Sequence, residues 1–393
     1  MERFGRILLK PYMKITFTFL FLAVAAGLSY SASQLEQGFD YKDMLPDDSY
    51  LKDAFEALDE YQARSGASPF VYFRGVDQSD VNIQDQMSKY VLELVEIDAI
   101  EQEPDDFWLW DFQNFTLTLS QEEQELSFEE RIQLFLADSA YRETYIDHIV
   151  LNDDGEVTAS RCLIFMDGVD WDIVTQQIDA LHDQRDVTKR QQINHGRDAD
   201  DWAFFTYFGG YDIWELYATS VVEIIKTTII GVFAVTGVSF LLIPHWSAPL
   251  FVFPFICLLY IDLLGWIQVF GLEVNAVTYI GMVMSIGLLV DFIMHILLRY
   301  YESSGTREER TVQTLKTMGS SIFLGGVSSL LGTMGLSMAS SSIFFSVFVV
   351  FFGLVILGVI HGLIFLPIIL STFGPEDPPT NMDSRAEKTS EEA

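Results

Sequence analysis

Uncharged and charged stretches alternate along the 393-residue chain. Asp, Glu, Lys and Arg are all absent from residues 15–35, 227–261, 274–290 and 317–375. A helix needs about 20 mostly apolar residues to cross the hydrocarbon core of a bilayer, and the last stretch is long enough for two crossings with a turn between them. The pattern predicts six membrane helices, at residues 14–34, 218–243, 248–270, 274–299, 317–338 and 342–371.

The segment between the first two expected helices, residues 35–217, has the composition of a water-soluble domain. It contains most of the 56 acidic residues, which explains how a chain that is 50% hydrophobic carries a formal net charge of −33. The periodicity of its apolar residues predicts strands at 68–74, 148–152, 157–166 and 202–208, and helices at 80–100 and 170–190.

The order of these elements is βαββαβ, which is typical of a ferredoxin-like α+β fold. Asp153-Asp154-Gly155 supplies the turn between the second and third strands. Residues 102–147 are expected as an insertion that contains an aromatic cluster and a helical segment at 127–140. The expected fold class is therefore a polytopic α-helical membrane protein with six membrane helices and an inserted ferredoxin-like α+β domain outside the cytoplasm.

Basic residues predict the orientation of the chain, because loops rich in Lys and Arg stay in the cytoplasm. Such residues surround the start of the first expected helix and recur in the loop at residues 299–316. Residues 1–13 and a disordered tail, residues 372–393, are therefore placed in the cytoplasm. The domain at 35–217 is placed in a lumen or outside the cell, and the sequence leaves open whether the membrane is the plasma membrane or an endomembrane.

Two further features bear on this topology. Asn114-Phe-Thr116 is a glycosylation sequon inside the acidic domain, which gives weak support because such triplets also arise by chance. The first apolar run follows basic residues, as a signal peptide does, but it is longer than the usual hydrophobic region of one, so an uncleaved anchor is expected. Cys162 and Cys257 lie in different parts of the chain, and no disulfide is expected between them.

Three groups of motifs in the chain resemble one family. They are Pro46–Asp53; Val274–Val277 with Gly287–His295; and Met318–Ser321 with His361–Leu370 and Phe373–Pro375. Together they resemble the C-terminal half of the Patched and Niemann–Pick type C proteins, within the RND (resistance–nodulation–division) superfamily. Family members usually contain two such halves. The resemblance therefore implies a half-transporter that pairs with a second half, either a copy of itself or another chain, and leaves a truncated gene product as the alternative.

Asp291 is the residue that most suggests function, because it lies in the middle of an expected membrane helix. A charged side chain at the centre of a bilayer costs about 2.5–3.5 kcal/mol on insertion scales, so such residues usually have a partner or a use. His295 follows one helical turn later, on the same face. The resemblance places both in the ion or proton relay of the family. A neutral, hydrogen-bonded Asp291 that serves only packing is the alternative.

Asp262 and His361 lie in two other expected membrane helices and are further relay candidates. Asp262 could face Asp291 and share a cation or a proton with it, or it could lie near the outer interface. His361 has no charged neighbour in its own span, so a hydrogen bond to a neighbouring helix is the simpler expectation. Ser328 and Ser329 belong to a helix rich in small residues, where close packing is expected; a bond from one of them to Asp291 is the functional alternative.

The sequence also argues against several classes of protein. A Walker A motif and metal-binding spacings of Cys and His are both missing from the sequence, and the soluble segment is too acidic to attract nucleic acid. We expect neither an enzyme nor a cofactor. The primary hypothesis is a transporter of a lipid or sterol-like substrate that is driven by an ion gradient through Asp291. The alternative is a receptor or lipid sensor that does not transport, because a shared fold does not fix function.

Overall fold

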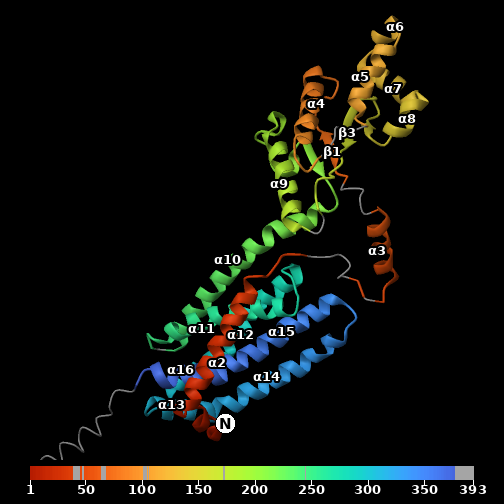
Figure 1. Ribbon diagram of the computed structural model, residues 1–393. Coiled ribbons are helices and arrows are strands. Elements are labelled where there is room, and N and C mark those ends of the chain that lie inside the picture. The colour runs from red at the N-terminus through yellow and green to blue at the C-terminus, as the bar shows by residue number, and fades with distance from the viewer. Residues whose placement is uncertain are drawn as a thin grey trace, which may run out of the picture. The chain divides into compact units, whose positions relative to one another are not determined.

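The computed structural model describes residues 1–38, 45–46, 48–62, 68–100, 104, 106–170, 173–243 and 245–376. Most of the expected tail, from residue 377 onward, lies outside the described residues. The chain divides into two units, Met1–Lys52 with Thr219–Ala393, and Asp53–Ala218. Each unit is described by itself below, and Figure 1 labels the elements of both.

Among the described residues, six helices are long and apolar enough to cross a membrane, as the sequence predicts, and they lie in the first unit except that the second of them begins in the other unit. The chain is therefore a polytopic α-helical membrane protein. The helices are α2 (Pro11–Ala32), α10 (Tyr211–Leu242), α11 (Ala248–Val269), α12 (Ala276–Glu302), a fifth from Arg307 to Met338 and a sixth from Ser342 to Phe373.

The fifth and sixth of these helices each contain a π-helical turn, which the sequence pattern did not indicate. The fifth consists of α13 (Arg307–Thr314), the π turn η4 (Leu315–Gly319), α14 (Ser320–Thr333) and the 3₁₀ turn η5 (Met334–Met338). The sixth consists of α15 (Ser342–Ile360), the π turn η6 (His361–Phe365) and α16 (Leu366–Phe373). Such turns inside α-helices often occur at functional sites.

Local sequence signals set the helix boundaries in this unit. Pro11 occupies the first turn of α2, where its missing N–H leaves no hydrogen bond unmade. Asn275 caps α12, because its side chain accepts hydrogen bonds from the backbone N–H groups of Val277 and Thr278, both at 3.0 Å. A short helix, α1 (Glu2–Leu8), precedes the first span.

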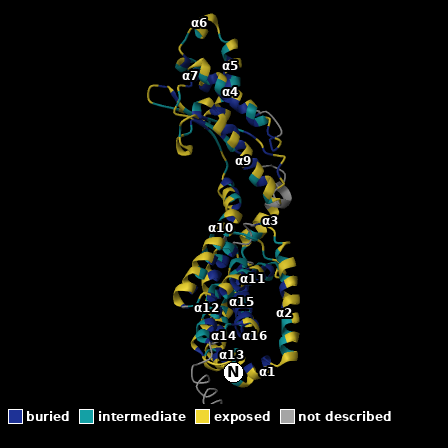
Figure 2. Cartoon of the chain, turned by 90° about the vertical axis from the view of Figure 1, so that its left-hand side faces the viewer, coloured by how far each residue is buried: buried dark blue, intermediate teal, exposed yellow. Residues whose placement is uncertain are grey.

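The interior of the membrane unit is formed mainly by α11, α12 and the sixth helix, whereas α2, α10 and α14 expose most of their side chains (Figure 2). α11 packs along α2 and also against α12 and α15. Gly265 lets α11 approach the backbone of Leu28 on α2, and Gly353 on α15 accommodates the ring of Trp266. Small residues of this kind allow the close helix contacts that stabilise membrane bundles.

The second unit is built on a four-stranded antiparallel sheet. Its strands are β1 (Phe70–Arg74), β2 (Ile149–Leu151), β3 (Val157–Leu163) and β4 (Phe204–Tyr207), in the order β2-β3-β1-β4. The four strands and the turn at Gly155, with φ of +84°, lie where the sequence predicts them. α4 (Val81–Val95) follows β1 and α9 (Val174–Arg190) follows β3, and these two helices pack against each other.

The expected insertion forms a small helical cluster in the same unit. It contains α5 (Trp108–Thr118), α6 (Gln121–Gln124), α7 (Phe128–Ala137) and α8 (Ser139–Tyr145). The ring of Phe135 on α7 contacts Phe112 and Phe115 of α5 and Tyr145 of α8 at centroid distances of 5.5–5.7 Å. The aromatic residues are therefore the core of the insertion. Further helices of the described chain are α3 (Tyr50–Gln62), which crosses the boundary between the units, and the 3₁₀ turns η2 (Gln192–Asn194) and η3 (Ala199–Asp201).

Candidate functional site

Asp291 and His295 line a cavity of about 620 Å³ in the membrane unit. The cavity lies between α12, α14 and the first half of the sixth helix, α15. Because residues four apart on a helix share one face, α12 presents both side chains to the same space. Both side chains are exposed in the structure. Solvent or a ligand that enters the cavity can therefore contact these two ionisable groups.

The walls of this cavity combine apolar and polar surfaces. Leu288, Ile322, Phe351 and Leu354 supply hydrocarbon and aromatic surface, while Ser321, Ser329 and Thr333 of the fifth helix add hydroxyl groups. Sites for small apolar molecules commonly have this composition, with a few polar groups that fix the orientation of the ligand.

The two serines that sequence reasoning considered as partners of Asp291 behave differently in the structure. The Ser329 hydroxyl lines the cavity, but it donates its hydrogen bond to the backbone oxygen of Gly325 at 3.0 Å. Ser328 is exposed and is not among the described residues of the cavity wall. Among the small residues of α14, Gly326 packs closely, against Val355 and Val359 of α15.

Asp262 contacts His361, and not Asp291 as sequence reasoning considered. His361 Nε2 lies 3.2 Å from Asp262 Oδ2, and both side chains are 1% exposed. Asp262 is therefore a buried residue of α11. His361, which has no charged neighbour in its own helix, obtains one from a helix about 100 positions earlier in the chain.

The surroundings of the pair fix the His361 ring. Its Nδ1 lies 2.8 Å from the backbone oxygen of Leu357, one turn earlier in the last span. Phe21 of α2 meets the ring edge-on, at a centroid distance of 4.7 Å, and stacks on Phe365 at 3.6 Å. The first span thus closes the site that α11 and the last span form, a contact that no motif in the sequence indicates.

Asp291 and the Asp262–His361 pair are connected by packing. Phe292, the neighbour of Asp291, lines the cavity and also lies against Gly358 and Gly362 of the last span. A Cβ atom at Gly362 would come within 2.6 Å of the Phe292 backbone oxygen. The helix that carries Asp291 is therefore in tight contact with the π turn that carries His361.

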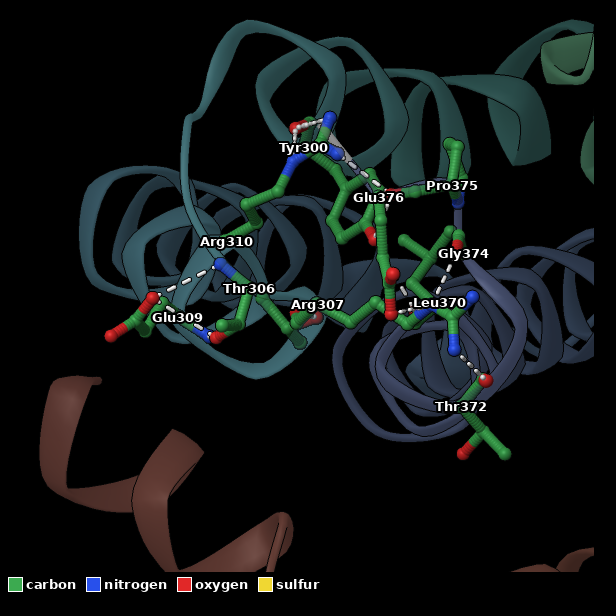
Figure 3. Close-up of polar contacts among 11 residues, drawn as sticks. Tyr300, Thr306, Arg307, Glu309, Arg310, Leu370, Thr372, Gly374, Pro375 and Glu376 are labelled. Atoms are coloured by element: carbon green, nitrogen blue, oxygen red, sulfur yellow. Dashed lines mark hydrogen bonds and ion pairs between the residues drawn. The ribbon is translucent and has the colours of Figure 1, made fainter. Parts of the chain in front are cut away.

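The end of the last span is held by two arginines of α13 (Figure 3). Arg310 is 2% exposed and donates to the backbone oxygens of Tyr300 and Pro375, at 3.0 Å and 2.7 Å. Arg307 donates to the backbone oxygen of Gly374 at 2.6 Å. Cations near a helix C-terminus satisfy carbonyls that have no partner within the helix. Sequence reasoning counted Arg310 as a loop charge, whereas the structure buries it.

Among the described residues, no group of three His, Cys, Asp or Glu side chains is arranged to hold a metal ion. Cys162 in β3 is buried and Cys257 in α11 is partly buried, and both are free thiols. Asn114, the sequon residue, is exposed on α5.

Comparison with known proteins identifies relatives of the chain, although no protein-family model matches it. A Niemann–Pick type C1-related protein of Toxoplasma gondii is 23% identical over 96% of this chain and 31% of its own length. The NPC intracellular cholesterol transporter 1 of Sus scrofa is 31% identical over 50% of this chain and 16% of its own. Patched-related protein 9 of Caenorhabditis elegans is 23% identical over 91% of this chain and 40% of its own.

A solved structure shares the fold. The hedgehog release protein Disp of the water bear Hypsibius dujardini matches 95% of this chain and 50% of its own, with a TM-score of 0.64 and 15% sequence identity. The chain thus spans less than half the length of the curated relatives named here, and it covers half of the solved structure.

Proposed function

Because the chain is a relative of the Patched and Niemann–Pick type C proteins, we propose that it moves a lipid or sterol-like apolar molecule and that an ion gradient drives this movement through Asp291. The observation that carries the proposal is the cavity on α12, where Asp291 and His295 share a space with apolar walls. One named relative is a cholesterol transporter, which supports an apolar lipid as the substrate class.

The chemistry of the two cavity residues supports a role in coupling. A carboxyl group and an imidazole can each bind or release a proton, and a carboxylate can bind a cation. An intramembrane ionisable residue is by default a candidate for such a role. Ser329 and Thr333 donate their hydrogens to backbone oxygens of α14, which leaves their lone pairs as acceptors in the cavity.

Two structural proposals accompany this function. The element order and the sheet order β2-β3-β1-β4 support a ferredoxin-like fold for the second unit, which would face the lumen or the exterior and receive the substrate there. The half-length match to the solved relative and the exposed apolar faces of α10 and α14 support pairing of the membrane unit with a second bundle. The mass of the active particle in mild detergent tests this pairing.

The decisive experiment for the proposed function is transport in proteoliposomes. We expect movement of a fluorescent sterol analogue to depend on an imposed proton or sodium gradient, and Asp291→Asn to remove the gradient-dependent part. Asn keeps the shape and some hydrogen bonding of Asp but cannot titrate. Asp85→Asn, at an exposed position of α4, is the matched control and should transport normally. Full gradient-driven transport by Asp291→Asn would contradict the relay and favour a receptor or sensor.

A further inference from the structure

We propose that Asp262 and His361 together hold one proton and form a proton-binding site of the membrane unit that is separate from the Asp291 cavity. The proposal begins with the burial of the pair, since both side chains are 1% exposed. A buried charge without a partner costs several kcal/mol, so the pair is stable only when its net charge is zero. The number of protons on the pair therefore decides whether this part of the bundle can stay closed.

The hydrogen bond of the ring defines where the protons are. Leu357 contributes a backbone oxygen, which can only accept, so Nδ1 of His361 carries a hydrogen and donates it. The other nitrogen, Nε2, faces Asp262 Oδ2 at 3.2 Å. Either Nε2 carries a second proton beside a carboxylate, or the carboxyl group carries it beside a neutral ring. Both forms have zero net charge, and both hold one proton between the two side chains.

Losing or gaining a proton would give the pair a net charge in apolar surroundings. Loss leaves a carboxylate beside a neutral imidazole, and gain leaves a carboxylic acid beside an imidazolium. The rings of Phe21 and Phe365 enclose the site and supply no compensating charge. Proton exchange at the pair should therefore require opening of the contacts among α2, α11 and the last span.

One atom of the pair shows where such an exchange could take place. Asp262 Oδ1 is buried and has no hydrogen-bond partner among the described residues. His361 Nε2 also makes no hydrogen bond that meets geometric criteria, although it lies 3.2 Å from Oδ2. Native proteins leave few buried polar atoms unsatisfied, and an exception calls for an explanation. An incoming water or proton that reaches Oδ1 explains it here.

Other titratable groups on the helices around the pair could also affect how many protons the pair holds. On the described elements that contact α11 or η6 they are Tyr12, Lys14 and Tyr30 on α2; Cys257 and Tyr260 on α11; and Tyr279, Asp291, His295, Arg299, Tyr300, Tyr301 and Glu302 on α12. Asp291 and His295 are directed to the cavity, whereas the pair lies behind Phe292 and the glycines that it contacts. The two sites are therefore neighbours joined by packing but hold their protons separately.

The test uses the full chain, labelled with ¹⁵N-histidine and reconstituted in lipid bilayers, and measures its histidine signals by solid-state NMR. We expect one histidine, absent from the spectrum of His361→Gln, to keep its protonated Nδ1 and its paired Nε2 signal across a pH range in which exposed histidines titrate. In Asp262→Asn the same residue should show a non-protonated Nε2, because the amide cannot supply a proton. Asp291→Asn should leave this signal unchanged.

Three results would overturn the proposal. They are titration of the His361 signal together with those of the exposed histidines, a His361 signal that is unaffected by Asp262→Asn, and a His361 signal that changes in Asp291→Asn.

If either single variant fails to fold, the double variant Asp262→Asn/His361→Gln serves to assign the His361 signal, since two neutral amides can hydrogen-bond to each other. The pH series on the unmodified chain then decides the question by itself. The readout does not involve transport, so it can fail or succeed independently of the proposed function.

Discussion

Asp291 and Asp262 are both acidic residues of membrane helices, but their surroundings give them different chemistry. Asp291 is exposed to a cavity, where solvent or a ligand can reach it and its charge can be stabilised or neutralised during a cycle. Asp262 is buried against His361, so any charge on its carboxyl group is balanced by that one side chain. A sequence shows only that each carboxyl interrupts an apolar run. The difference between an accessible and an enclosed acid depends on how helices from distant parts of the chain face each other.

A histidine in the second unit gives a testable pH dependence. His148 precedes β2 and lies beside the rings of Phe70 and Tyr145. Burial, with the charge of Arg161 as a second cause, lowers the pKa of His148. The folded unit therefore favours neutral His148, and this contribution to stability is complete above the ordinary histidine pKa of about 6.5. It is lost as the pH falls through the lowered pKa of the folded state.

We accordingly expect the second unit to become less stable as the pH falls below about 6.5, and His148→Gln to weaken this dependence. The measurement is urea unfolding of the full chain in detergent, followed by its tryptophan fluorescence, at several pH values. His182→Gln, at an exposed position of α9, is the control and should keep the original pH dependence. If the free energy of unfolding of His148→Gln changed with pH as steeply as that of the unmodified chain, the pH dependence would not come from His148.

At the scale of elements, the sequence predicts most of what local pattern can define. The six membrane helices, the four strands and the turn at Gly155 all follow from periodicity and turn chemistry. The π turns η4 and η6 do not, because a single shifted hydrogen-bond register leaves the apolar pattern intact. The sequence singles out Asp291, Asp262 and His361 one by one as interruptions of apolar runs. It does not indicate that His361 lies beside Asp262, since that contact depends on helix packing and not on spacing.

The contacts of Arg310 at the end of the last span should have a measurable effect on the stability of that helix end. Arg310 bridges the backbone oxygens of Tyr300 and Pro375 through separate N–H groups, and its guanidinium lies 4.4 Å from the ring of Tyr300. Lysine carries a single ammonium group and cannot reproduce this planar, multiple contact. The Tyr300 oxygen also accepts from the N–H of Ser303, and the Pro375 oxygen from the Tyr300 hydroxyl, so both carbonyls keep a partner. Arg310→Lys should therefore remove only the hydrogen bonds to the guanidinium, at a cost of about 1.5–3 kcal/mol.

Hydrogen exchange of the full chain in detergent checks this prediction. We expect amides at the C-terminal end of α16 to exchange about tenfold faster or more in Arg310→Lys, as the lost free energy implies. Arg307→Lys is the matched comparison, because the Arg307 side chain is 38% exposed and water can replace its contacts. Equal exchange rates in Arg310→Lys and the unmodified chain would show that the Arg310 contacts do not stabilise this helix end.

At the scale of the whole molecule, charge is distributed unevenly between the two units. The acidic residues are concentrated in the segment that forms the second unit, whereas Lys and Arg are frequent around α1 and α13 of the first. Several of these basic residues have structural partners: Lys14 pairs with Glu308 at 2.6 Å and Lys316 with Glu2 at 2.9 Å. These pairs tie α1 and the start of α2 to the fifth helix, so the N-terminus and the loop before α13 belong to the same end of the membrane unit.

This arrangement supports a prediction about orientation. Loops rich in Lys and Arg remain in the cytoplasm, so the end with α1 and α13 should be cytoplasmic, and the acidic unit should lie on the other side. In sealed vesicles of known orientation, a protease site introduced between Ser303 and Thr306 should be cut from the cytoplasmic side only. A site introduced at the exposed turn Asp153–Gly155 should be cut from the opposite side only. Cytoplasmic cleavage at that turn would reverse the topology and would leave Asn114 without access to the glycosylation machinery, whereas luminal cleavage together with a mass change in Asn114→Gln would support both proposals.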